Sequence, residues 1–118
     1  MQLLEREQAR LAKEQDRQSK VQAKQAEQIR KHEKKLAELE QKLAQAEADI
    51  EHWTNQVCKL YALLDIAEQE QFSAVPGSKA DLKAQKQIIA LDNQIHSAEA
   101  RLNKAKYIKK TASKELAA

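Results

Sequence analysis

Three histidines and one cysteine are the side chains of this sequence best suited to metal binding or nucleophilic chemistry. His32, His52 and His96 lie far apart along the chain and fall on different faces of the expected helices. A zinc motif of the His-Glu-x-x-His type begins at His32, but Leu36 occupies the place of its second histidine. Cys58 has no neighbouring histidine to activate its thiol. The sequence therefore predicts no metal ion, no cofactor and no catalytic residue.

The other residues that could take part in catalysis do not indicate a reaction either. Acidic pairs such as Glu38 and Glu40 are typical of solvated helix surfaces. Gly77 is the only glycine, so the chain has no Gly-rich loop to hold a phosphate. We therefore expect a protein that is not an enzyme and has no small-molecule substrate.

Composition points to long helices. Charged residues make up 33% of the chain and aromatic residues 3%, with one glycine and one proline. This balance is typical of coiled coils, and it supplies too little aromatic bulk for a large globular core. No apolar run is long enough to cross a membrane, and a single cysteine excludes an intrachain disulfide. Because residues 1–8 show no secretory leader, we expect a cytoplasmic protein that does not engage a membrane.

One break divides the chain into two helices. Pro76 lacks a backbone donor and Gly77 tolerates a positive φ, so a helix should end before them. Ser78 stands three residues before Asp81, as in a capping box that starts a new helix. These signals predict a first helix to about residue 73, a turn over residues 74–78 and a second helix over residues 79–118.

Apolar residues recur in both helices at alternating spacings of three and four, which is the heptad signature of a coiled coil. We assign Leu36 to heptad position a and Leu39 to position d. In the first helix the stripe contains Leu36, Leu39, Leu43, Ala46, Ile50, Trp53, Val57, Leu60, Leu64 and Ala67. In the second helix it contains Ala84, Ile88, Leu91, Ile95, Ala98, Leu102, Ala105, Lys109, Ala112 and Leu116, in which only Lys109 is polar.

The two stripes match each other across the turn. Residues that would face each other in an antiparallel pair have numbers with a nearly constant sum, centred on Pro76. Asp49 would then pair with Arg101, Glu47 with Lys106 and Lys35 with Glu115. The sequence therefore predicts an all-α, antiparallel coiled-coil helical hairpin over residues 34–118. The same stripes would also serve arms exchanged between two copies.

Residues 1–33 should form a polar, single-helix overhang. Their heptad seam is mostly glutamine, but Ala, Glu, Gln, Lys and Arg give them high helix propensity. Without packing partners such a helix should fray in solution. Either a linker from a larger protein or a partner-binding helix would fit this segment.

Apolar residues outside the seam widen the hairpin near its turn. We consider two explanations: they cover the tip, with Val75 tucked between them, or they form a contact surface for a protein partner. We favour the contact surface, with a homodimer as the first expectation. The candidate contact residues are Tyr61, Leu63, Ile66, Phe72, Leu82 and Ile89.

Nucleic-acid binding is the alternative function. A lysine cluster near the C-terminus is interleaved with Tyr107, and its contacts to phosphate would be nonspecific and salt-sensitive. Positive charge is also favourable at a helix C-terminus on its own account. The candidate residues are Lys104, Lys106, Lys109, Lys110 and Lys114.

Four segments resemble uncharacterised small coiled-coil proteins of bacterial prophages and conjugative elements. They are QAEADIEHW (45–53), LYALLD (60–65), VPGSK (75–79) and NQIH (93–96). The similarity extends over residues 20 to about 118. It implies no activity and no catalytic residues, and it suggests a mobile-element accessory protein that engages a host or phage machine.

Overall fold

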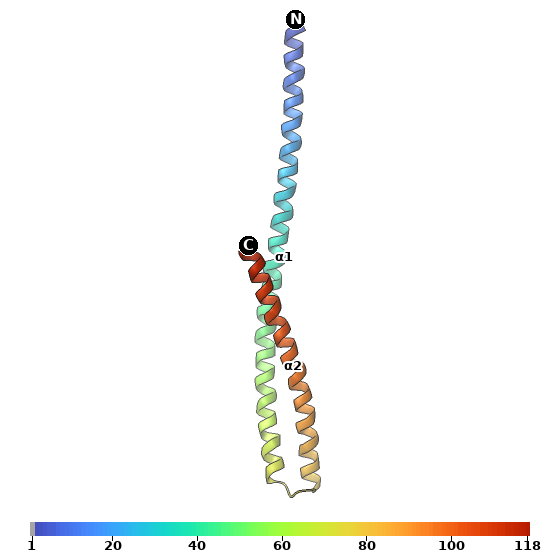
Figure 1. The fold of residues 1–118 in the computed structure, drawn as a ribbon, viewed down its shortest axis with the longest axis vertical. Coiled ribbons are helices and arrows are strands. Elements are labelled where there is room, and N and C mark those ends of the chain that lie inside the picture. Colours follow the sequence, from blue (N-terminus) through green and yellow to red (C-terminus); the bar gives the residue numbers. More distant parts are fainter. Residues whose placement is uncertain (1) are drawn as a thin grey trace. The chain divides into compact units, whose positions relative to one another are not determined.

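The computed structural model describes residues 2–118, which form two α-helices joined by one turn (Figure 1). Helix α1 spans Gln2–Ser73 and α2 spans Lys79–Ala117. No strand occurs among these residues. The predicted all-α helical hairpin is confirmed, and the helix bounds agree to within one residue at the C-terminus. The chain divides into two compact units, Met1–Glu38 and Leu39–Ala118.

The described residues of the first unit are helical throughout. Every side chain from Leu3 to Lys35 is exposed. These residues include no glycine or proline, and strong helix formers predominate. Helix propensity accounts for this segment, which confirms the helix expected over residues 1–33 for the part that the structure describes.

The second unit is an antiparallel hairpin. Contacts between its arms pair Tyr61 with Glu99 and Trp53 with Arg101, so residue numbers on α2 rise as those on α1 fall. Both arms come from one chain and lie side by side up to the turn (Figure 1). The pairing direction inferred from the two heptad stripes is confirmed.

From Leu39 onward, the predicted stripes form the seam between the arms. All of their residues are buried or half-buried, with the single exception of Lys109. The most deeply buried ones are small, and a row of alanines lets the two backbones approach closely. This row consists of Ala46, Ala67, Ala84, Ala98, Ala105 and Ala112. No large side chain among the described residues is fully buried, so the core is one layer thick.

The seam drifts around α2 toward the C-terminus. Ile108 and Thr111 are half-buried although neither belongs to the predicted stripe, whereas Lys109 is exposed. Over the last turns of α2 the contact line therefore departs from the ideal heptad assignment, and Ile108, in place of Lys109, lies toward α1.

Three backbone and side-chain contacts define the turn. Ser78 is the N-cap of α2, and its Oγ accepts a hydrogen bond from the Asp81 amide at 3.2 Å. The Asp81 carboxylate accepts one from the Gly77 amide at 2.8 Å. Asp81 is buried, and Gln85 Nε2 donates to it as well. The predicted capping box is therefore present with one change, since Asp81 accepts from residue 77 instead of from the N-cap itself.

Gly77 has a φ of 79°, in the left-handed region that side chains disfavour. A Cβ added there would meet nothing within 4 Å, so backbone strain is the only cost of a substitution. We expect Gly77→Ala to lower the free energy of unfolding by about 1 kcal/mol. Urea unfolding followed by circular dichroism measures this loss. Gly77→Asn should lose less, because asparagine tolerates this conformation better; equal losses for Ala and Asn would contradict the explanation.

Candidate functional site

The seam leaves two unequal sides on the hairpin. Heptad positions e and b make one side, the e flank, and positions g and c make the other, the g flank. The charged and large apolar residues of the e flank are Glu40, Glu47, Glu51, Tyr61, Asp65, Glu68, Phe72, Leu82, Ile89, Asp92, Glu99, Lys106 and Lys110. Those of the g flank are Lys42, Asp49, Lys59, Leu63, Ile66, Glu70, Lys83, Arg101, Lys104, Ile108 and Glu115.

The two flanks differ in charge. The e flank holds seven acidic residues and two lysines, whereas the g flank holds three acidic residues and five basic ones. Because two copies of a strongly acidic surface repel each other, the e flank is a poor surface for self-association. The nearly balanced g flank carries no such penalty.

All six candidate contact residues near the turn are exposed, but they do not share one side. Leu63 and Ile66 belong to the g flank, and the other four belong to the e flank. Phe72 is 93% exposed and Val75 is 72% exposed, so neither is tucked against the tip as the covering explanation requires. The widened tip is thus two apolar patches on opposite flanks.

The g-flank patch is a groove. Leu63 and Ile66 line it together with Ala67 on α1 and with Ala90 and Leu91 on α2. Glu70 and Gln87 stand at the end of the groove that lies nearer the turn. Beyond them the groove continues along small or polar residues, namely Ser73, Ala74, Ala80, Lys83 and Ala84. This groove is a concave surface lined mostly by apolar side chains.

Four residues along the α1 edge of this groove form a pattern that the sequence analysis missed. Lys59, Leu63, Ile66 and Glu70 follow one another at spacings of four, three and four residues, which places them on one helix face. All four are exposed. Their order is cation, apolar, apolar, anion. Searching for helical spacing outside the apolar seam would have revealed the row.

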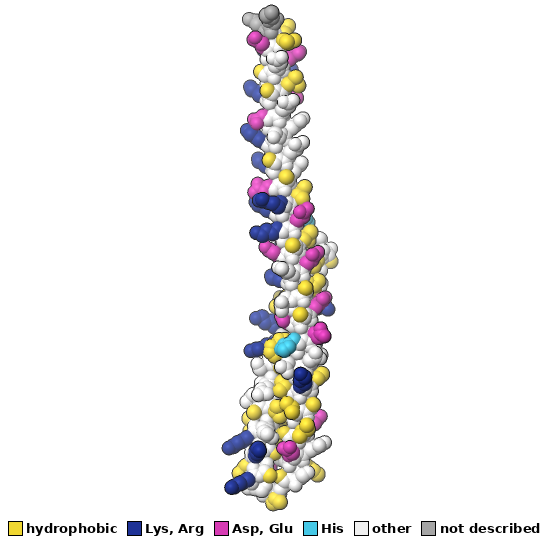
Figure 2. Space-filling model, turned by 180° about the vertical axis from the view of Figure 1, so that it is seen from behind, with side chains coloured by type: hydrophobic (Ala, Val, Ile, Leu, Met, Phe, Trp, Pro, Cys, Tyr) yellow, Lys and Arg dark blue, Asp and Glu magenta, His cyan; other side chains and the backbone are white. Residues whose placement is uncertain are grey.

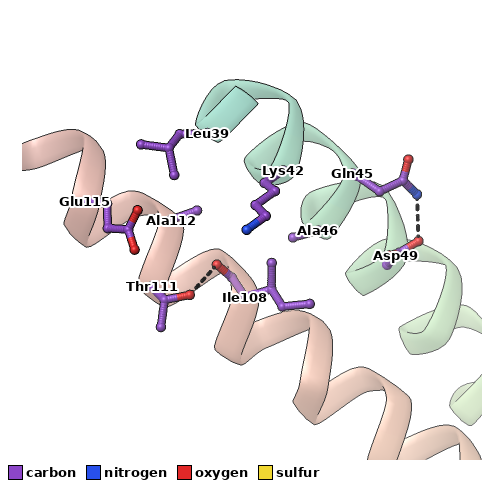
Figure 3. A pocket seen from close by; sticks show the side chains of 9 residues that line it. All are labelled: Leu39, Lys42, Gln45, Ala46, Asp49, Ile108, Thr111, Ala112 and Glu115. Carbon is purple, nitrogen blue, oxygen red and sulfur yellow. Dashed lines mark hydrogen bonds between the residues drawn. The ribbon is translucent and has the colours of Figure 1, made fainter. Parts of the chain in front are cut away.

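A second recess lies at the other end of the g flank, between α1 and the last turns of α2 (Figure 3). Lys42 extends from α1 toward α2 in this recess. Gln45 Nε2 donates to Asp49 Oδ1 at 3.0 Å, and Thr111 Oγ1 donates to the Ile108 carbonyl at 3.0 Å. Its remaining lining residues are Leu39, Ala46, Ala112 and Glu115. Mixed charges and shallow apolar contacts give this recess no constellation for acid, base or nucleophilic chemistry.

Polar contacts between the arms differ from the predicted pairs. Arg101 does not form an ion pair with Asp49; its guanidinium lies over the Trp53 ring, 4.8 Å from the centroid. Glu47 pairs with Lys109 at 3.9 Å instead of with Lys106. Glu47 pairs with Lys109 because the shift of the seam places Lys109 outside it, on the e-flank side. Arg101 stacks on Trp53 because a planar guanidinium packs well on an aromatic face.

Tyr61 makes a short hydrogen bond across the hairpin. Its hydroxyl donates to Glu99 Oε1 at 2.7 Å. This hydrogen bond raises the pKa of Tyr61, and the negative charges of Glu99 and Asp92 raise it further. The phenol is therefore held in its neutral, donating form, and the contact fixes the register of the arms on the e flank.

The remaining candidates from the sequence do not come together into a site. His52 packs edge-on against Trp53, with ring centroids 4.8 Å apart, and Cys58 is exposed. The structure brings no three His, Cys, Asp or Glu side chains of residues 2–118 close enough to hold a metal ion. Within the same residues, neither helix has a stretch long and apolar enough to span a bilayer.

The five C-terminal lysines are distributed around α2. Lys104 lies on the g flank, Lys106 and Lys110 lie on the e flank, and Lys114 is on the outer face. Lys109 already contacts Glu47. Lys106, Lys110 and Lys114 follow one another at spacings of four and share one helix face, so three of the five lysines form a continuous row.

Fold and surface together define the class of this chain: it is an all-α helical hairpin with a coiled-coil seam and an apolar groove on one flank. Comparison with family models, with characterised proteins and with solved structures finds no match.

Arg101 is expected to stabilise the hairpin through the only tryptophan of the chain. We predict that Arg101→Gln lowers the free energy of unfolding by about 0.5–1 kcal/mol and shifts Trp53 fluorescence to longer wavelength, because the ring becomes more hydrated. Lys104→Gln is the matched control, since Lys104 lines a cavity together with Trp53 and Arg101 but does not cover the ring. An equal loss in both variants would show that net charge, not stacking, is responsible.

Tyr61 gives a prediction for alkaline pH. The difference between absorbance titrations of the native chain and Tyr61→Phe should have a midpoint above about 10, the ordinary pKa of tyrosine. Because the folded state holds this proton more tightly, the contribution to stability is fully present below pH ~10 and is lost as pH rises through the raised pKa. Glu99→Gln should bring the midpoint down toward the ordinary value; an unchanged midpoint would contradict the assigned cause.

Proposed function

We propose that this chain is a non-enzymatic, cytoplasmic coiled-coil module that associates with a second copy of itself through the g flank. The observation that carries the proposal is the exposed row of Lys59, Leu63, Ile66 and Glu70 beside an apolar groove. A two-fold dimer uses the same patch on both subunits, so that patch must be complementary to itself.

The row meets this requirement when two copies pack antiparallel. Each Leu63 then faces the second copy's Ile66, and each Lys59 faces the second copy's Glu70. The same operation therefore places apolar residues together in the centre and opposite charges at both ends. Such an arrangement, with an apolar centre and a polar rim, is the usual anatomy of a protein interface.

Burial supports the same conclusion. Leu63 is 51% exposed and Ile66 is 53% exposed in the single hairpin, although the groove beside them is apolar. The one-layer core leaves this area in water, and covering it would contribute about 25 cal/mol for each Å² of apolar surface removed from solvent. A second hairpin supplies that cover, while the acidic e flank opposes dimerisation through the other side.

The resemblance to coiled-coil proteins of prophages and conjugative elements supports a role in a mobile element, but it does not bear on dimerisation. In that setting the dimer would be an accessory factor that presents its other surfaces to a larger machine. The e-flank residues Tyr61, Phe72, Leu82 and Ile89 remain free in such a dimer and are the candidate contacts for that machine.

Association should be lost when charge is placed in the groove. We expect Leu63→Glu combined with Ile66→Glu to convert a mass of two chains, each 13.4 kDa, into that of one chain while helicity is retained. Both side chains are half exposed in the monomer, so the hairpin itself should tolerate the change. Light scattering behind a sizing column, over a concentration series, measures the mass.

Leu82→Glu combined with Ile89→Glu is the matched control, because it places the same charges on exposed apolar residues of the e flank. This variant should dimerise as the native chain does. If the native chain is a monomer at every concentration, or if only the e-flank variant dissociates, the g flank is not the association surface.

Charge exchange tests the pairing register itself. Lys59→Glu alone, or Glu70→Lys alone, should weaken the dimer about tenfold, because each creates two like-charge contacts across the two-fold axis. The double exchange should restore the native affinity, since opposite charges face each other again. Failure of the double variant to recover would reject the antiparallel register.

A further inference from the structure

A row of positive charge follows one face of the N-terminal part of α1. In a helix with 3.6 residues per turn, residues that recur every three or four positions line up along one face. Between Arg6 and Lys35, nine positions line up in this way. Eight of these nine positions are basic, and the only interruption is Gln28. The cationic row consists of Arg6, Arg10, Lys13, Arg17, Lys20, Lys24, Lys31 and Lys35. In Figure 2, Lys and Arg side chains recur along one edge of this helix.

Every residue of the cationic row is exposed. No acidic residue falls within the row, although acids of this segment, such as Asp16 and Glu27, lie directly beside it. Two members have an acidic neighbour one turn away: Lys20 is 3.4 Å from Asp16, and Lys31 is 3.6 Å from Glu27. Both pairs are open to water, so the row keeps its positive character along its whole length.

This arrangement opposes helix stability in the free protein. Cations four residues apart repel each other on a helix surface, and the row contains several such pairs, among them Arg6 with Arg10 and Lys13 with Arg17. Interspersed acids at the same spacing would have stabilised the segment instead. A polyanion lying along the row would turn this repulsion into attraction, which points to a ligand with closely spaced negative charges.

We propose that the cationic row binds the phosphate backbone of double-stranded nucleic acid without reading its sequence. The row is about 44 Å long, with a cation at nearly every helical turn of ~5.4 Å. A duplex carries one negative charge per ~1.7 Å of its axis, so several phosphates lie within reach of the row at once. Long, flexible Lys and Arg side chains accommodate the curvature of the backbone.

Other polyanions fit the face less well. A membrane-binding helix needs a continuous apolar face opposite its cations, but here Leu4, Leu11 and Ile29 are separated by glutamines. Single strands are usually held by aromatic stacking, and residues 2–38 include no Phe, Trp or Tyr. The acidic e flank of a second copy is spread over two helices and broken by apolar residues, so it matches a single row poorly.

Binding to duplex DNA of about 30 base pairs, which at ~3.4 Å per pair is longer than the row, tests the proposal. We expect the full chain to bind at about 50 mM salt, with a log–log salt slope of about −4. The variant with Arg10, Lys13, Arg17 and Lys24 all changed to Gln should bind on the order of 100-fold more weakly and with a shallower slope. Glutamine keeps high helix propensity, so circular dichroism can confirm that the helix persists.

The matched control changes Lys86, Lys106, Lys110 and Lys114 to Gln. It removes the same net charge from α2 and includes three of the C-terminal lysines considered above as a nucleic-acid surface. This control should retain the native affinity to within about threefold. An equal loss in both variants, or no binding at low salt, would overturn the proposal.

Two further outcomes would also overturn it. Binding of anionic phospholipid vesicles or of polyglutamate with the same affinity as the duplex would mean that the row has no preference for nucleic acid. A halved mass of the row variant in light scattering would mean that the row pairs with the acidic flank of a second copy. The Leu63→Glu, Ile66→Glu variant should still contact DNA, which separates this proposal from dimerisation through the g flank.

Discussion

The close approach of two helices along a row of alanines is the interaction on which this structure depends. Ala46 and Ala67 on α1, with Ala84, Ala98, Ala105 and Ala112 on α2, are the most deeply buried apolar residues of the hairpin. Small side chains allow a tight interhelical contact, but they remove little apolar surface from water. The larger seam residues are therefore only half-covered, and the hairpin depends on its turn, on the Trp53–Arg101 stack and on Tyr61–Glu99 to hold one register.

This thin seam explains the surfaces on either side of it. A two-helix seam cannot cover residues at heptad positions b, c, e and g, so whatever the sequence places there faces water. On the e flank these are mainly acids, and Glu99 serves the seam by accepting from Tyr61. On the g flank they include Leu63 and Ile66 beside a groove, where a further helix can pack without charge repulsion. The self-association that we propose is thus a response to a core that one chain leaves incomplete.

The two units of the chain have different physical roles. Residues 39–118 contain the seam, the capped turn and all contacts between helices described above. Residues 2–38 are helical through propensity, and their side chains from Leu3 to Lys35 remain in water. A helix with no apolar face can still present charge in a regular line. The proposed dimerisation and the proposed backbone binding therefore use different residues, and either could be lost without the other.

Heptad spacing, the Pro76-Gly77 break and the Ser78 cap were sufficient to predict two helices, their bounds and their antiparallel pairing from the sequence alone. These features are local or periodic, and long helices with one turn leave few alternative folds. The three-dimensional structure was needed wherever geometry departs from an ideal repeat. It placed Ile108 toward the seam and Lys109 outside it, where burial over the last turns of α2 departs from the seven-residue assignment. It also placed Arg101 on Trp53, and it divided the apolar residues near the turn between two flanks, because packing and not spacing decides which side chains meet.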